Sequence, residues 1–224
     1  MITVHHLNNS RSQRILWFLE ELGIEYQIEF YQRDAKTNLA PAELSQIHPL
    51  GKSPVITDSN NSITVAESGA ILDYLAREYG SHFLPEVNTQ AYRDCQYWLH
   101  FAEGSLMPML LIKLMFDKVK TAPVPFILKP VTKGIADKAM AAYAGPNIKR
   151  MLTYIDDYLN DKQYFADSKL TIADIQMSFP LEASIQHLKG TDVYPHIQQY
   201  VKRLQSRPSY KSALKKGGQY DYAT

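Results

Sequence analysis

The stretch of residues 50–80 constrains the fold of this chain more than any other part of its sequence. Two short β-branched runs, at residues 55–57 and 63–65, flank five turn-forming residues, which is the pattern of a β-hairpin. Apolar residues then recur at helical spacing, so a helix should begin near Glu67 or Ser68. The chain must therefore accommodate a hairpin that runs directly into a helix.

Two polar features of this stretch favour a bound ligand. Pro54 follows Ser53 at the start of the first strand, where a cis peptide bond would leave the Ser53 backbone free to pair outside the sheet. Glu67 and Ser68 place an acid and a hydroxyl at a helix N-terminus, whose free N–H groups favour a carboxylate. Each feature alone is more often a turn device or a helix cap, but here they stand thirteen residues apart across one hairpin.

The segment before the hairpin completes a recognisable order of elements. We expect a strand, a helix, a strand and a short helix, at residues 2–7, 11–22, 24–31 and 41–47. With the hairpin and its helix they give the order βαβαββα, in which the helical crossover implies a parallel pair of strands. This order predicts an α/β thioredoxin-like N-terminal domain over residues 1–80.

Strand signals stop beyond residue 89. We therefore expect a linker at residues 81–88 and an all-α C-terminal domain at residues 89–224. Pro108 should kink or break a long helix there, because proline lacks the backbone N–H that a helix interior needs. Thr171 and Asp174 have the spacing of a capping box, which makes Asp174 a structural residue.

Ser10 lies between the first strand and the first helix and has two interpretations. It is a good helix N-cap, since its hydroxyl could accept a hydrogen bond from a free backbone N–H. The hydroxyl could instead donate a hydrogen bond to a sulfur anion bound beside Pro54. That bond, together with the dipole of the helix, would lower the pKa of a thiol below its usual value of about 8.5.

The segment at residues 9–17, Asn-Ser-Arg-Ser-Gln-Arg-Ile-Leu-Trp, resembles the serine-type active-site segment of theta-like and related bacterial and fungal glutathione transferases. The resemblance implies that Ser10 activates the thiol of glutathione, with Ser12 as the alternative and Arg14 as the arginine inside the helix. Other members carry cysteine at this place. Serine therefore implies conjugation or thiolate chemistry in preference to disulfide exchange.

The same resemblance implies a complete glutathione site. The Ser53 backbone, before a cis Pro54, would pair with the cysteinyl backbone of glutathione, and Glu67 and Ser68 would hold its γ-glutamyl end. Lys52 would meet the glycyl carboxylate or be an ordinary surface lysine. The loop that often lines that end contains Gln32 and Arg33.

A second substrate should bind between the two domains, against apolar side chains. The candidates for that wall are Met107, Leu111 and Met115, each of which could instead fill the helical core. Residues 117–134 look like a class-specific insertion near this pocket, and residues 215–224 like a loose tail. Glu103 would reach the glutathione of a neighbouring subunit, as in several relatives, or form a plain salt bridge.

Composition narrows the remaining classes of function. A formal net charge of +1 gives no electrostatic argument for nucleic acid or an anionic membrane, and no apolar run approaches the roughly 20 residues of a membrane-spanning helix. The single cysteine, Cys95, cannot form an internal disulfide, and its thiol is expected to be inert. The N-terminus lacks the features of a signal peptide, so we expect a cytoplasmic protein.

The sequence thus favours a glutathione transferase that conjugates the glutathione thiolate to small hydrophobic electrophiles. The expected co-substrate is glutathione, with no other cofactor and no metal, and the family implies a homodimer. Two alternatives stay open: a glutathione-dependent peroxidase or reductase, and a non-catalytic protein of the same fold that binds ligands or partners.

Overall fold

The hairpin is present in the computed structural model, which describes residues 1–187 and 194–223. Strands β3 (Val55–Asp58) and β4 (Ile63–Ala66) pair antiparallel, with Ile56 opposite Val65. Helix α3 (Ser68–Tyr79) follows at once. The prediction of a hairpin that runs directly into a helix is therefore confirmed.

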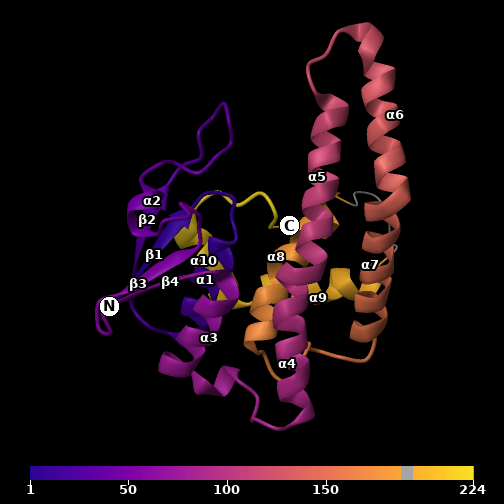
Figure 1. Ribbon diagram of the computed structural model, residues 1–224. Coiled ribbons are helices and arrows are strands. Elements are labelled where there is room, and N and C mark those ends of the chain that lie inside the picture. Colours follow the sequence, from indigo (N-terminus) through magenta and orange to yellow (C-terminus); the bar gives the residue numbers. More distant parts are fainter. Residues whose placement is uncertain (188–193, 224) are drawn as a thin grey trace.

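A mixed four-stranded sheet of order β2-β1-β3-β4 forms the N-terminal part of the molecule (Figure 1). Strand β1 (Ile2–Leu7) lies between β2 (Tyr26–Tyr31) and β3; it runs parallel to β2 and antiparallel to β3. Helix α1 (Ser12–Leu22) connects β1 to β2, and α2 (Leu44–Ile47) lies between β2 and β3. The predicted order βαβαββα and the thioredoxin-like class are confirmed.

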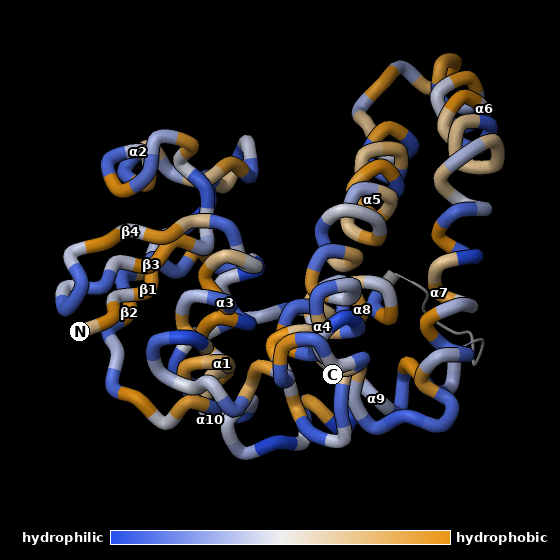
Figure 2. Tube along the Cα trace, turned by 60° about the horizontal axis from the view of Figure 1, so that its bottom comes forward, coloured by the Kyte–Doolittle hydropathy of each residue, from blue (hydrophilic) through white to orange (hydrophobic). Residues whose placement is uncertain are grey.

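Helix α1 lies between the sheet and the helical part of the chain (Figure 2). Eight consecutive residues, from Ser12 to Leu19, are buried, whereas a single apolar stripe would bury only one side. The reason is that α1 packs on β1 and α3 and also on α8 and α10. At the contact with α10, a Cβ at position 217 would lie 2.6 Å from the Gln13 Oε1 atom and 2.8 Å from the Leu16 Cδ1 atom, so a residue larger than glycine would displace both side chains.

The helical part contains two long helices, each with a π-helical segment. Helices α4 (Gln90–Phe101) and α5 (Met107–Thr121) are joined through the π segment Ala102–Leu106. Likewise α6 (Lys129–Ala139) and α7 (Gly145–Leu159) are joined through Met140–Ala144. Pro108 and Pro146 each stand at the second position after a π segment, so the wider turn replaces the expected break.

The remaining elements are α8 (Ile172–His187), α9 (Pro195–Gln205), α10 (Pro208–Gly217) and two short 3-10 segments, Ser81–Phe83 and Phe126–Leu128. In the part of the chain that the structure describes, one helix, Gln90–Thr121, is long and apolar enough by length and composition to cross a membrane, whereas the sequence predicted none. It packs against α8 and α6, but only 28% of its most apolar stretch is buried.

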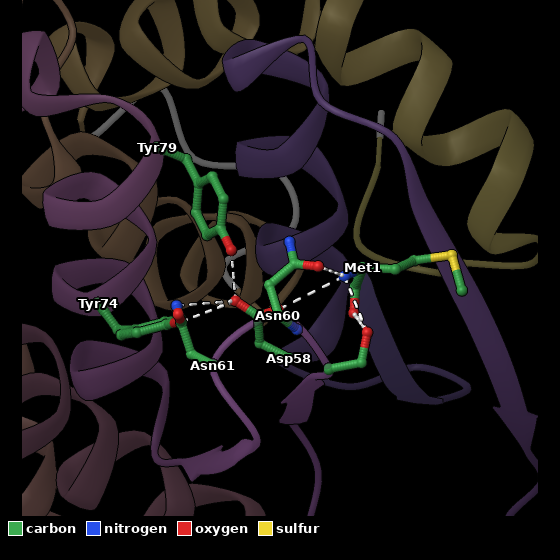
Figure 3. Close-up of polar contacts among 7 residues, drawn as sticks. Met1, Asp58, Asn60, Asn61, Tyr74 and Tyr79 are labelled. Carbon is green, nitrogen blue, oxygen red and sulfur yellow. Dashed lines mark hydrogen bonds and ion pairs between the residues drawn. The ribbon is translucent and has the colours of Figure 1, made fainter.

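Asp58, which is buried, joins the hairpin to α3 through a cluster of polar groups (Figure 3). Its carboxylate accepts hydrogen bonds from the Tyr74 hydroxyl, at 2.7 Å, and from the Tyr79 hydroxyl, and its Oδ1 atom lies 3.6 Å from the Met1 ammonium. Burial raises the pKa of this carboxyl, but the tyrosine hydrogen bonds bring it below its usual value. Asp58 is therefore held as a carboxylate that fixes the hairpin against the helix.

The C-terminal segment is not loose where the structure describes it. Helix α10 extends to Gly217, the Tyr220 hydroxyl donates to Glu182 at 2.6 Å, and Asp221 accepts from the Asn9 side chain at 2.8 Å. The prediction of a loose tail is therefore wrong up to residue 223. Its partners lie far away in sequence, and no local pattern indicates them.

Candidate active site

Two neighbouring cavities open where the sheet-containing part meets the helices. The smaller, of about 280 Å³, lies between the start of β3, the start of α3 and the π segment of the long helix. The larger, of about 500 Å³, lies between the β1–α1 turn, α5, α8 and the C-terminal segment. Both are lined by Arg11, Ser53 and Leu111, so they share a boundary.

The smaller cavity brings together five of the predicted glutathione-binding residues: Lys52, Ser53, Pro54, Glu67 and Ser68. The Ser53–Pro54 peptide bond is cis, as predicted. The Ser53 hydroxyl donates to the His5 carbonyl at 2.9 Å. The side chain of Ser53 is therefore engaged within the protein, which leaves its backbone as the group available to a ligand.

Glu67 has an unusual backbone conformation at the start of α3. Its φ of 71° and ψ of 123° lie where non-glycine residues are rare, at a cost of about 1–3 kcal/mol. Such conformations persist where the surrounding structure fixes them, and they cluster at binding sites. Here the conformation puts Glu67 directly before the first turn of α3, beside Ser68 and the free N–H groups of that turn.

Ser10 lines the larger cavity and is buried except for 5% of its surface. Its hydroxyl oxygen accepts from the Ser12 backbone N–H at 3.2 Å and lies 2.7 Å from the Ser12 hydroxyl. Ser10 thus satisfies one free N–H of α1 and also has its hydroxyl at a cavity wall. The two interpretations of Ser10 are compatible in this geometry.

Ser12 is fully buried and lines neither cavity. Its hydroxyl lies 2.9 Å from the Nδ1 atom of His6, which makes a chain of hydrogen bonds from His6 through Ser12 to Ser10. Burial lowers the pKa of His6 to about 4, so its imidazole is neutral at pH 7. When Ser12 donates to Ser10, the Ser10 oxygen accepts two hydrogen bonds and its own proton is free to point toward a ligand.

Arg14, the arginine inside the first helix, is buried and ties α1 to the helical part. It donates to the Gln176 carbonyl at 2.7 Å and to the Glu103 carboxylate. Glu103 also accepts from Arg11, at 3.1 Å. Burial lowers the pKa of Arg14, and Glu103 opposes that effect. Glu103 therefore forms salt bridges within its own chain, beside the smaller cavity.

The larger cavity has an apolar wall, mainly from α5 and α8. Of the three predicted second-substrate residues, Met107 and Leu111 line it, whereas Met115 is 67% exposed and lines neither cavity. The wall also contains two aromatic side chains that were not predicted from the sequence, Phe179 and Tyr222, whose ring centroids lie 5.3 Å apart. Their positions in the chain, far from α5, carry no local signal of a shared pocket.

The loop after β2 contributes to the larger cavity and not to the smaller one. Arg33 lines the larger cavity and donates to the carbonyls of Asn8, at 3.3 Å, and Asn38, at 3.2 Å. Gln32 is exposed and lines neither cavity. Cys95 also lies outside both, and burial raises the pKa of its thiol to about 11, in keeping with an inert thiol.

Comparison with protein families decides what kind of protein carries these cavities. The family model for the N-terminal domain of glutathione S-transferases matches residues 1–77, and the model for the C-terminal domain matches residues 109–208. The chain belongs to the glutathione S-transferase family. Among the residues described, 1–187 and 194–223, no three histidine, cysteine or acidic side chains are grouped as metal ligands.

Individual members of the glutathione S-transferase family are similar over nearly the whole chain. Glutathione S-transferase 1 of Saccharomyces cerevisiae is 35% identical over 96% of this chain and 95% of its own length. Glutathione S-transferase 3 of Schizosaccharomyces pombe is 37% identical over 96% of this chain and 88% of its own length. A solved structure of a glutathione S-transferase from Actinobacillus pleuropneumoniae is 31% identical in sequence and has a TM-score of 0.81. The match covers 99% of this chain and 95% of that one. These matches support the prediction of a glutathione transferase.

Proposed function

We propose that this protein transfers the thiolate of glutathione to small hydrophobic electrophiles. The observation that carries the proposal is the shared boundary between a small cavity that Lys52, Glu67 and Ser68 help to line and a larger cavity with an apolar wall. Ser10 lines the larger cavity, and Ser53 lines both. A thiol held by the Ser53 backbone would therefore lie close to the Ser10 hydroxyl and face the apolar wall.

Each part of glutathione has a matching group in this arrangement. The γ-glutamyl carboxylate would meet the Ser68 hydroxyl and the N-terminal N–H groups of α3, while Glu67 would take the ammonium group. The cysteinyl backbone would pair with the backbone of Ser53, and Lys52 lines the same cavity as a partner for the glycyl carboxylate. Arg33, on the wall of the larger cavity, is a weaker candidate for that end.

The chemistry would follow from the hydrogen bond that Ser10 donates. A donor that meets the sulfur anion but not the neutral thiol lowers the thiol pKa, and the proton leaves to solvent. The thiolate then attacks an electrophilic carbon. A C–S bond forms, and the leaving group departs with the bonding electron pair or, in an addition, the product takes up a proton. Binding and orientation in adjoining cavities supply the remaining rate enhancement.

The test is a comparison of three reactions of the purified protein with glutathione. The electrophile is 1-chloro-2,4-dinitrobenzene, and the competing substrates are an organic hydroperoxide and a low-molecular-weight disulfide. We expect conjugation in the wild type and a roughly 10- to 100-fold loss in Ser10→Ala, the loss of one hydrogen bond to a charged group. Ser81→Ala is the matched control, because Ser81 is exposed and outside both cavities.

The alternatives predict different results in the same experiment. Reduction of the hydroperoxide or disulfide without conjugation would replace the proposal by a peroxidase or reductase. Absence of glutathione binding in the wild type would favour a non-catalytic member of the family. We extend the proposal to a homodimer, as the family resemblance implies, and to a cytoplasmic location. Sedimentation equilibrium and cell fractionation test these two points.

A further inference from the structure

The outer ends of α5 and α6 form a projection that stands away from the rest of the molecule (Figure 1). We call residues 113–138 the α5–α6 tip; it includes the 3-10 segment Phe126–Leu128 and the predicted insertion at 117–134. Helix α6 packs mainly against α5, so most of the tip has no neighbour within the chain. Apart from Leu114, which lines the larger cavity, the function proposed above leaves this part of the structure without a role.

The tip exposes bulky apolar side chains. Phe126 and Ile127 are 83% and 84% exposed, the highest values among the large hydrophobic residues described. Further exposed apolar residues of the tip are Met115, Val119, Leu128, Val131 and Ile135. Figure 2 shows hydrophobic residues along the outer parts of both helices. Single exposed apolar residues are ordinary, whereas a cluster of this kind marks a surface that binds something.

The same tip concentrates positive charge. It contains six lysines and two aspartates, a formal net charge of +4, whereas the whole chain carries +1. Lys113 pairs with Asp117 and Lys120 with Asp137. The other four lysines of the tip form no ion pair in the described part of the chain, and they are Lys118, Lys129, Lys133 and Lys138. The surface is therefore apolar and cationic at once.

We propose that the α5–α6 tip docks on an anionic lipid surface. Large apolar side chains such as Phe126 and Ile127 would enter the region between head groups and acyl chains, while the lysines contact anionic head groups. The sequence-based prediction of no membrane partner relied on the net charge of the whole chain. Acidic residues elsewhere in the chain offset the +4 of the tip in that sum. The proposal concerns contact with a surface and not a spanning helix.

Charge also favours lipid over a second copy of this chain. Two tips in a symmetric contact would bring +4 against +4, and like charges oppose such a contact. If the proposed function holds, docking has a consequence for the substrate. The apolar wall of the larger cavity contains Met107 and Leu111 of α5, the helix whose outer end is the tip. The cavity would then be held near membranes, where hydrophobic electrophiles accumulate.

The experiment is vesicle flotation of the full chain. Vesicles of phosphatidylcholine alone are compared with vesicles that also contain phosphatidylglycerol, at low and at high salt. We expect wild type to float at least tenfold better with the anionic vesicles at low salt and to lose most of this binding at high salt. Flotation needs no catalysis, so its outcome is independent of the proposed transferase activity.

Two pairs of substitutions separate the apolar from the electrostatic contribution. Phe126→Asp with Ile127→Asp should lower partition more than 10-fold, through lost apolar insertion. Lys129→Glu with Lys133→Glu should lower it about 25-fold or more, since each lysine near an anionic surface contributes about a factor of five. Val87→Asp is the matched control, because Val87 is 61% exposed and lies outside the tip.

Three results would overturn the proposal. The first is a wild type that does not float with anionic vesicles. The second is undiminished flotation of both tip variants, each with a thermal unfolding curve like that of wild type. The third is a change of oligomeric state in the tip variants without any vesicle binding by wild type, which would make the tip a contact between copies of the chain.

Discussion

Replacement of Asp174 by alanine should be among the most destabilising single changes in the helical part of this protein. The carboxylate is fully buried at the start of α8. It accepts from the Phe165 N–H at 2.9 Å, the Thr171 N–H at 2.8 Å and the Tyr200 hydroxyl at 2.7 Å. The Thr171 hydroxyl adds a fourth hydrogen bond, at 2.9 Å.

The magnitude follows from the donors that alanine would leave behind. Two backbone N–H groups and the Tyr200 hydroxyl would lose their acceptor in the interior, at about 1–3 kcal/mol for each unsatisfied group. Relief of the buried carboxylate and entry of water offset part of this sum. We therefore expect a loss of about 4 kcal/mol, a large fraction of the 5–15 kcal/mol typical of a whole domain.

Urea unfolding followed by tryptophan fluorescence measures this loss. Trp98 is a suitable reporter, because its ring lies 4.6 Å from that of Phe165, which is next to the Asp174 network. The matched control is Asp157→Ala on the exposed side of α7, expected to change the unfolding free energy by less than about 0.5 kcal/mol. A loss below about 1 kcal/mol for Asp174→Ala, with an unchanged slope, would refute the role assigned to this carboxylate.

Local signals explain why so much of the smaller cavity could be predicted. A cis proline at a strand start and an acid before a hydroxyl at a helix start are features of short segments. The sequence therefore placed Pro54, Glu67 and Ser68 correctly in one cavity. The order of the first seven elements could be predicted for the same reason, since hairpins, crossovers and caps have short-range patterns.

The larger cavity could be predicted only in part, because its walls come from distant segments. Phe179 and Tyr222 meet Met107 and Leu111 only after the C-terminal segment folds back over α8. Helical periodicity shows that a side chain is apolar, but it does not show whether that side chain lines a cavity, fills the core or is exposed. For this reason Met115, which is exposed, was included in the predicted pocket. Charge behaves similarly, since a net value of +1 for the chain conceals the cationic α5–α6 tip.

Three further predictions concern the site and the buried groups around it. Ser12→Ala should raise the thiol pKa of bound glutathione by about half a unit, which is less than the effect of a change at Ser10. The reason is that this substitution removes a hydrogen bond to Ser10 and none to the sulfur. Ultraviolet titration of the thiolate measures the shift. Tyr222→Ala should raise KM for a hydrophobic electrophile several-fold and leave KM for glutathione unchanged in steady-state kinetics; a change in the glutathione KM alone would contradict its place in the larger cavity. Burial raises the pKa of Glu182 to about 7, above its value in the unfolded chain. The native state therefore binds a proton that the unfolded state releases, and stability falls as pH rises from about 5 to about 7. Glu182→Gln should remove about 3 kcal/mol of this pH dependence of the unfolding free energy, as measured by denaturant titrations at several pH values. The same change of unfolding free energy with pH in both proteins would contradict this prediction.

The central claim is that the Ser10 hydroxyl stabilises the glutathione thiolate. Its most direct test is the ultraviolet absorbance of bound thiolate against pH in wild type, Ser10→Ala and the control Ser81→Ala. One hydrogen bond to a charged group is worth about 1.5–3 kcal/mol, or about 1–2 pKa units. We expect the thiol pKa to lie well below its free value in wild type and Ser81→Ala, and to rise by about 1–2 units in Ser10→Ala. Equal pKa values in all three proteins, with glutathione bound in each, would contradict the claim.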